Sequence, residues 1–122
     1  MAKIERFEDL QCWMEARILV KMIYTICMEG KLSKDFGMQD QLKRASISVM
    51  NNIAEGFSRF SRKEFVRFLS VSQSSASEVK SMLYIVEDLN YASNEQLQII
   101  HNQLDKTRSL ILAFIKYLNK NS

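Results

Sequence analysis

The chain has 122 residues, of which 47% are hydrophobic and 25% are charged, with three glycines and no proline. This length and composition fit a single, compact, all-helical domain over 1–122 with its own hydrophobic core, and they exclude a disordered chain. The formal net charge is +3, but residues 42–80 alone hold seven Lys or Arg against three Asp or Glu. The positive charge is therefore concentrated in the middle of the chain.

The sequence predicts neither secretion nor insertion into a membrane. The N-terminal segment MAKIERFEDLQ mixes both charges and lacks the apolar core of a signal peptide. The longest apolar stretch, 18–28, contains Lys21 and is too short to cross a bilayer. Cys12 and Cys27 fall on one predicted helix, about 22 Å apart, so they cannot form a disulfide with each other. We therefore expect a cytoplasmic protein with free thiols and no membrane partner.

Hydrophobic residues recur at steps of three and four in four segments of the chain. These segments predict helices over about 8–29, 38–57, 62–89 and 94–119. The predicted core stripes are Trp13, Ala16, Val20, Ile23 and Cys27; Leu42, Ala45, Val49, Asn52 and Gly56; Phe65, Phe68, Ser72, Ser75, Val79, Met82, Val86 and Leu89; and Leu97, Ile100, Leu104, Thr107, Ile111, Phe114 and Leu118. Because the connections are short, successive helices should run antiparallel. We predict an all-α, up-down-up-down four-helix bundle.

Capping residues mark most of the predicted helix ends. Ser61 with Glu64, and Ser93 with Gln96, have the spacing of a capping box at a helix start. Gly30 can end the first helix in a left-handed conformation, and the segment KLSKDFG after it is expected to be a loop. A glycine at the end of the second helix, Gly56, is expected to loosen that end.

The first and last helices carry more hydrophobic residues than one core stripe needs. The surplus is Met14, Ile18, Leu19, Met22, Ile26 and Met28 in the first helix, with Ile99, Leu110 and Leu112 in the last. Either these side chains are buried deep in one bundle, or they form a second face that self-association covers. We favour self-association, because no helix of a four-helix bundle is enclosed on all sides.

A line of polar residues runs along the second helix, where a continuous apolar stripe would be expected. Gln41, Ser48, Asn52 and Glu55 share one helical face, and Ser75 and Glu78 lie on the corresponding face of the third helix. Such groups are costly to bury unless they bond to one another. We interpret the six residues as a structural network that sets helix register or a subunit contact, with binding or catalysis as the alternative.

A basic and aromatic turn follows the polar line. Arg59, Arg62, Lys63 and Arg67 surround Phe57 and Phe60, and Lys43, Arg44 and Lys80 add charge to the same pair of helices. Clustered cations favour phosphate backbones, and exposed aromatic rings stack on unpaired bases. The seven basic residues are therefore candidate nucleic-acid contacts. The alternative is a solvated helix start with the phenylalanines packed beneath it.

The residues of familiar catalytic sites are missing from the sequence. His101 is the only histidine, and Gln98 stands three residues before it, where a di-iron bundle protein has a glutamate. We find no glycine-rich phosphate loop and no motif for an activated serine or cysteine. We expect a protein that is not an enzyme, with no cofactor and no metal site.

The segment QLKRASISVMNNIAEGFSRFSRKEFVRFL, residues 41–69, resembles the signature of a bacterial family of four-helix bundle proteins. These are also called 23S rRNA intervening-sequence proteins, because some members are encoded within large-subunit ribosomal RNA genes. The matching residues are Phe7, Leu10, Trp13, Gln41, Leu42, Arg44, Ala45, Ser48, Asn52, Ile53, Ala54, Glu55, Gly56, Ser61, Glu64, Phe65, Phe68, Leu69, Ser75 and Glu78. Met50 replaces a family proline, which should weaken a kink, and Ser74 replaces a glycine, which should widen the contact between the second and third helices.

The resemblance implies a bundle that assembles into a homopentamer. It also implies a relationship to the accessory proteins of diversity-generating retroelements, which look like basic pentamers that bind nucleic acid and a reverse transcriptase. We therefore expect a non-enzymatic, pentameric accessory or scaffold protein that binds RNA or DNA. The alternative is an adaptor that docks a protein partner, such as a reverse transcriptase, through apolar faces of the first and last helices.

Overall fold

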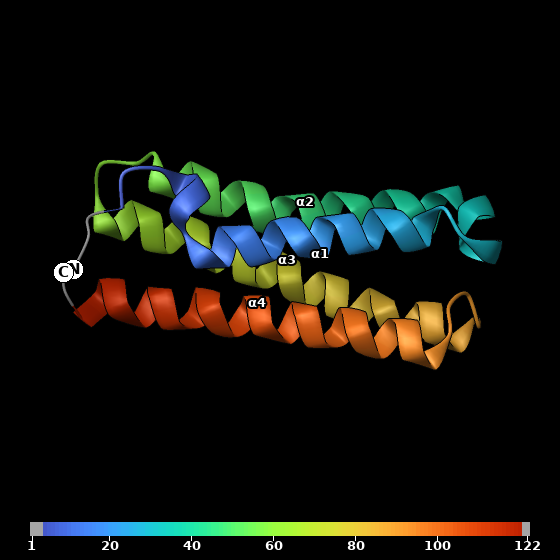
Figure 1. The fold of residues 1–122 in the computed structure, drawn as a ribbon. Coiled ribbons are helices and arrows are strands. Elements are labelled where there is room, and N and C mark those ends of the chain that lie inside the picture. The colour runs from blue at the N-terminus through green and yellow to red at the C-terminus, as the bar shows by residue number, and fades with distance from the viewer. Residues whose placement is uncertain (1–3, 121–122) are drawn as a thin grey trace.

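Four long antiparallel helices, joined by short connections, make up the described part of the protein (Figure 1). The computed structural model describes residues 4–120, so the ends of the predicted domain, 1–3 and 121–122, lie outside it. The elements are η1 (Phe7–Asp9), α1 (Gln11–Cys27), η2 (Gly30–Lys34), α2 (Phe36–Phe57), α3 (Arg62–Asp88) and α4 (Asn94–Lys120). Both α1 and α3 pack against α2 and α4, so α1 and α3 occupy opposite corners of the bundle. The predicted all-α, up-down-up-down architecture is confirmed.

The largest differences from the predicted boundaries lie on either side of α1. Leu10 has an extended backbone conformation (φ −75°, ψ 124°), which separates the short 3-10 helix η1 from α1. The segment predicted as a loop, residues 31–37, is mostly helical, because η2 includes its first four residues and α2 begins at Phe36. Asp35 is the N-cap of α2, because its Oδ1 accepts a hydrogen bond from the Met38 amide (3.0 Å). Its Oδ2 accepts another from the Tyr91 hydroxyl (2.9 Å).

The predicted caps form with different degrees of completeness. At the start of α4 the box is reciprocal: the Gln96 amide donates to Ser93 Oγ, and the Ser93 amide donates to Gln96 Oε1, both at 3.1 Å. Gly30 does adopt a left-handed conformation (φ 50°), but it lies three residues beyond the end of α1 and opens η2. The left-handed cap that was not predicted is Asn90 (φ 56°), which ends α3 with the Tyr91 amide bonded to the Val86 carbonyl (3.0 Å).

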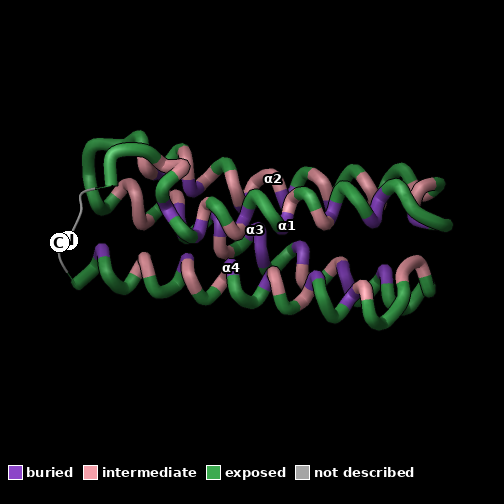
Figure 2. The backbone as a smooth tube through the Cα atoms, in the orientation of Figure 1, coloured by how far each residue is buried: buried purple, intermediate pink, exposed green. Residues whose placement is uncertain are grey.

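The core runs the whole length of the bundle between the four helices (Figure 2). The predicted stripe of α4 is confirmed, with six of its seven residues buried and Phe114 half-buried. The α2 stripe is also buried, apart from the half-buried Asn52. In α3 the stripe ends early, because Leu89 is exposed at the helix end.

The surplus hydrophobic residues of α1 divide between the core and the surface. Leu19 and Ile26 were predicted to lie off the core stripe, but both are buried in the core, while Trp13 and Val20 of the predicted stripe are only half-buried. Met14, Ile18 and Met28 of α1 are exposed, as are Ile99 and Leu112 of α4, whereas Met22 and Leu110 are half-buried. Apolar surface therefore remains on α1 and α4.

No helix within residues 4–120 has the length and apolar character that spanning a membrane requires.

Candidate functional site

The turn between α2 and α3, residues 58–61, is fixed by hydrogen bonds at both ends. The Ser58 amide donates to two carbonyls in the last turn of α2, at 3.2 and 3.3 Å. Ser61 Oγ accepts the Glu64 amide at 3.1 Å and so caps α3. Glu64 does not complete the predicted box, because its carboxylate accepts from Arg67 Nε (2.8 Å) instead. Four residues thus reverse the chain and hold their side chains at one end of the bundle.

The two phenylalanines of the turn have opposite environments. Phe57 is half-buried and packs edge-on against Phe65, whose ring in turn contacts Phe114, with ring centres 6.2 and 5.1 Å apart. Phe60 has a relative exposure of 109%, the highest among the exposed large hydrophobic residues. The packed-phenylalanine interpretation therefore holds for Phe57 alone. Phe60 presents its whole ring to solvent at the tip of the turn.

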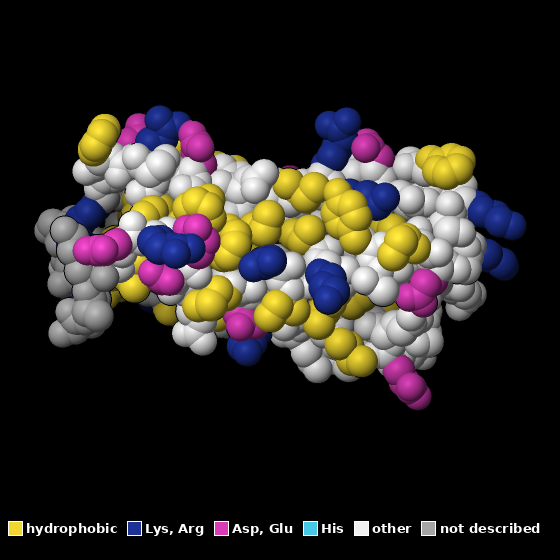
Figure 3. Space-filling model, turned by 45° about the horizontal axis from the view of Figure 1, so that its top comes forward, with side chains coloured by type: hydrophobic (Ala, Val, Ile, Leu, Met, Phe, Trp, Pro, Cys, Tyr) yellow, Lys and Arg dark blue, Asp and Glu magenta, His cyan; other side chains and the backbone are white. Residues whose placement is uncertain are grey.

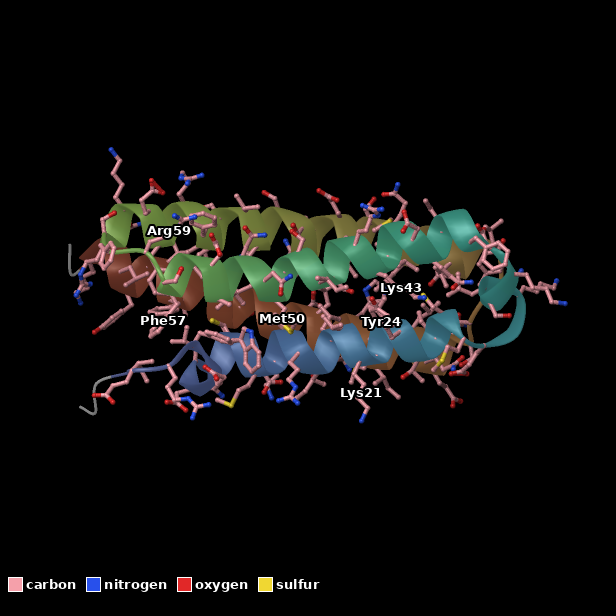
Figure 4. All side chains as sticks on the ribbon, turned by 90° about the horizontal axis from the view of Figure 1, so that it is seen from above. Lys21, Tyr24, Lys43, Met50, Phe57 and Arg59 are labelled. Carbon is pink, nitrogen blue, oxygen red and sulfur yellow. The ribbon has the colours of Figure 1, made fainter. Side chains whose placement is uncertain are left out.

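Two of the arginines flank a third phenylalanine beside the turn. The guanidinium of Arg59 lies 4.8 Å from the ring centre of Phe68, and that of Arg67 lies 4.6 Å from it. Both arginines also pair with carboxylates, Arg59 with Glu55 (2.6 Å) and Arg67 with Glu64 (2.8 Å). Figure 4 shows Arg59 lying over α3, beside the last turn of α2. These contacts fix both guanidinium planes but leave them at the surface.

Arg62 and Lys63 supply the unpaired charge of the turn. Both are exposed, and within residues 4–120 neither takes part in an ion pair. They are the first two residues of α3, where the helix dipole is positive, so their charges and the dipole repel each other. An anion bound at this end would relieve that repulsion.

The other three predicted basic residues lie away from the turn. Lys43 is half-buried between α2 and α1, with its Nζ 4.9 Å from the ring centre of Tyr24 (Figure 4). Arg44 is exposed and forms an ion pair with the residue one turn back on α2 (2.9 Å). Lys80 lies between α3 and α4, bonded to Asp105 (3.0 Å). The candidate site is thus reduced to the four basic residues around the turn.

The central part of the predicted polar network forms between α2 and α3. Ser48 Oγ lies 2.7 Å from Ser75 Oγ, and Asn52 Nδ2 donates both to the Ser48 carbonyl (2.8 Å) and to Ser48 Oγ (3.0 Å). A residue of the third-helix stripe, Ser72, adds a buried bond to the Val49 carbonyl (2.6 Å). The cluster lies within one chain, so these three predicted residues set the α2–α3 contact.

The remaining members of the predicted network are not part of this cluster. Gln41 and Glu78 are exposed on α2 and α3, and Glu55 is exposed and bonded to Arg59. These residues share helical faces with the cluster, as predicted, but the faces point partly towards solvent. Sequence position alone does not show how far a stripe turns towards solvent.

Comparisons with known proteins agree with this architecture. A family model described as the 23S rRNA-intervening sequence protein matches residues 8–113. The chain belongs to this family. A solved structure with the same fold is a protein of unknown function from the S23 ribosomal protein family of Bacteroides thetaiotaomicron, with 24% identity and a TM-score of 0.78 over 86% of this chain and 98% of that one. A comparison with curated proteins gave no match.

The signature glycine of this intervening-sequence family member has a packing role. Gly56 is buried near the end of α2, and a Cβ at this position would lie 2.8 Å from Phe65 Cδ1 and 2.9 Å from Phe68 Cβ. It therefore lets α3 approach α2 closely and does not loosen the helix end. Met50 is half-buried within an unbroken α2, and Ser74 is exposed, so it cannot widen the α2–α3 contact as predicted.

The two cysteines and the single histidine have shifted pKa values. Burial raises the pKa of the Cys12 thiol to about 11, and it also raises the pKa of Cys27, so both free thiols stay protonated near neutral pH. His101 is half-buried with its Nδ1 3.3 Å from Lys80 Nζ; burial and then the lysine charge lower its pKa. Within residues 4–120, no three His, Cys, Asp or Glu side chains are grouped as a metal site would need.

Two apolar hollows lie on the sides of the bundle. One, of about 730 Å³, lies between the start of α1 and the end of α4, and Arg62 stands at its edge. The other, of about 360 Å³, lies between α1 and α4, lined by Ile18, Met22 and Ile99 among others. Both have the size of ligand pockets, but they are open surface hollows.

Proposed function

We propose that this protein is a non-enzymatic nucleic-acid-binding accessory or scaffold protein that acts as an oligomer, in the form of a pentameric ring. The observation that carries the proposal is the α2–α3 turn, where the fully exposed ring of Phe60 stands beside the unpaired cations of Arg62 and Lys63. Arg59 and Arg67, fixed over Phe68, extend the positive edge along α3.

Each part of the turn suits a different part of a single strand. Lys and Arg neutralise phosphates and release counterions, while an exposed aromatic ring stacks on an unpaired base. One such turn offers few contacts, so a single copy should bind weakly. In an oligomer, several turns act on one strand, and the effective concentration of the second site raises the affinity.

Reversing the charge of the turn should abolish binding. We expect the wild-type protein to bind a fluorescein-labelled single-stranded RNA or DNA with micromolar affinity, weakening at least about tenfold from 50 to 200 mM salt. The triple variant Arg59→Glu, Arg62→Glu, Lys63→Glu should show no rise in fluorescence anisotropy. The matched control, Lys31→Glu, Lys34→Glu, Arg44→Glu, makes the same charge change in η2 and the first half of α2, away from the turn, and should keep most of the binding. The proposal would be wrong if the wild-type protein formed no complex at low salt, or if both triple variants lost binding equally.

Removing the exposed ring of Phe60 should show how much stacking, as distinct from charge, contributes to the binding of a single strand. Phe60→Ala should weaken binding of a single strand roughly 5- to 150-fold, because one base–aromatic stack contributes about 1–3 kcal/mol. Binding of a duplex, whose bases are already stacked, should change little. Phe36→Ala, which removes a ring of 76% exposure at the opposite end of α2, is the control and should leave both affinities intact. Equal effects of the two substitutions would exclude a stacking role for Phe60.

A second candidate function is a protein adaptor. The hollow between α1 and α4, with the exposed side chains of Ile18 and Ile99 at its border, favours this candidate because it could accept an apolar side chain of a partner. An adaptor without its partner should be monomeric or polydisperse, whereas the scaffold proposed above should have one defined mass.

A further inference from the structure

The outward face of α1 carries an apolar–charged–apolar pattern with a period of seven residues. Met14, Lys21 and Met28 are all exposed, with Met14 at 41% and Met28 at 73%. Figure 4 shows Lys21 pointing away from the bundle. In Figure 3, hydrophobic side chains form a band along the bundle with Lys and Arg among them, on the side where α1 lies. A shallow hollow along this face is lined by Met14, Arg17, Ile18 and Lys21.

The outward face of α3 carries the same pattern with the opposite charge. Val71 and Ile85 are 42% and 44% exposed, and Glu78 lies midway between them. The exposed residues along this face also include Ser74 and Ser81, whose short side chains leave room for another helix to approach. Glu78 is therefore the one acidic group between two apolar side chains.

The two faces match in spacing and in charge. In each, an apolar residue lies seven positions before and seven after the charged one, which is about 10 Å along a helix in either direction. When Lys21 stands opposite Glu78, both apolar pairs also come opposite each other, whether the helices run parallel or antiparallel. Within residues 4–120, neither Lys21 nor Glu78 makes an ion pair.

We propose that the outward face of α1 in one copy docks on the outward face of α3 in a second copy, with Lys21 paired to Glu78. The pairing cannot form within one chain, because α1 and α3 occupy opposite corners of the bundle. A second copy is the partner that the chemistry indicates, since one chain supplies both complementary halves. The contact is head-to-tail, because it joins two different surfaces. Repeating it from copy to copy gives a ring if the rotation between neighbouring copies closes the circle, and a filament if it does not.

A charge swap tests the pairing directly. Size-exclusion chromatography with light scattering should give the wild type a mass that is a multiple of 14.2 kDa. Lys21→Glu and Glu78→Lys each place like charges face to face, so each should weaken assembly roughly tenfold or more. The double variant Lys21→Glu, Glu78→Lys restores opposite charges and should regain the wild-type mass. Circular dichroism melting checks that all three variants remain folded.

The outcomes separate this inference from the proposed function on which it rests. A wild-type mass of 14.2 kDa would overturn both the oligomeric part of that function and this interface. A wild-type oligomer that neither single reversal disturbs, or that the double variant fails to restore, would overturn the interface alone. Lys31→Glu, which reverses an exposed lysine of η2, is the control and should keep the wild-type mass.

Discussion

Replacing Gly56 with alanine is expected to lower the free energy of unfolding by about 1–3 kcal/mol. The added Cβ would stand 2.8 Å from Phe65 Cδ1 and 2.9 Å from Phe68 Cβ, closer than carbon atoms approach without displacement. The Phe65 ring has little freedom to move, because it packs between Phe57 and Phe114. The helix propensity gained on replacing glycine, about 1 kcal/mol, is therefore outweighed by the overpacking.

Urea unfolding followed by circular dichroism measures this loss, and Gly37→Ala is its matched control. Gly37 lies in the first turn of α2, where a Cβ would meet only a carboxylate oxygen of Asp35 at 3.8 Å. There the substitution should leave stability unchanged or raise it by up to about 1 kcal/mol. An unfolding midpoint of Gly56→Ala equal to or above that of the wild type would show that the α2–α3 approach tolerates a methyl group.

Gly56 also shows what the sequence could and could not predict. The hydrophobic spacing and the Ser and Gln caps located the four helices to within a few residues, because these signals act over one or two turns. The role of Gly56 depends on Phe65 and Phe68, which follow it on another helix, so its local sequence indicated only flexibility. The N-cap of α2 was not predicted for a similar reason: Asp35 is held by Tyr91, which is 56 residues away.

The structure brings together those candidate residues that are neighbours in the chain. Phe60 and its adjacent cations lie in one turn, so their proximity follows from the sequence. Lys43 and Lys80 share helices with that turn, but 100° of rotation per residue directs them towards α1 and α4. The Glu55–Arg59 pair had a readable signal, since the two residues are four apart on a helix. No sequence signal indicated that Phe68 lies between two arginines, because that position depends on the geometry of the turn.

The small buried residues between α2 and α3 give the second large expected effect. Ser72→Leu should destabilise the protein by about 3 kcal/mol, because Ser72 is fully buried and its Oγ is already 2.6 Å from the Val49 carbonyl. The larger side chain must push α3 away from α2 and separate Ser48 from Ser75, which are in contact at 2.7 Å. Ser72→Ala removes only the hydrogen bond, so it should cost about 1 kcal/mol.

Comparing Ser72→Leu with Ser72→Ala and Ser77→Leu tests whether packing or hydrogen bonding explains the effect. Ser77 lies on the exposed side of the same helix, so the identical substitution there should change stability by less than about 0.5 kcal/mol. If the polar cluster mattered chiefly through its hydrogen bonds, Ser72→Ala would be as damaging as Ser72→Leu. If the serines matter because they are small, Ser72→Leu should unfold at a much lower urea concentration than Ser72→Ala. The second result would show that the Ser48, Ser72 and Ser75 side chains act chiefly by setting the spacing between α2 and α3.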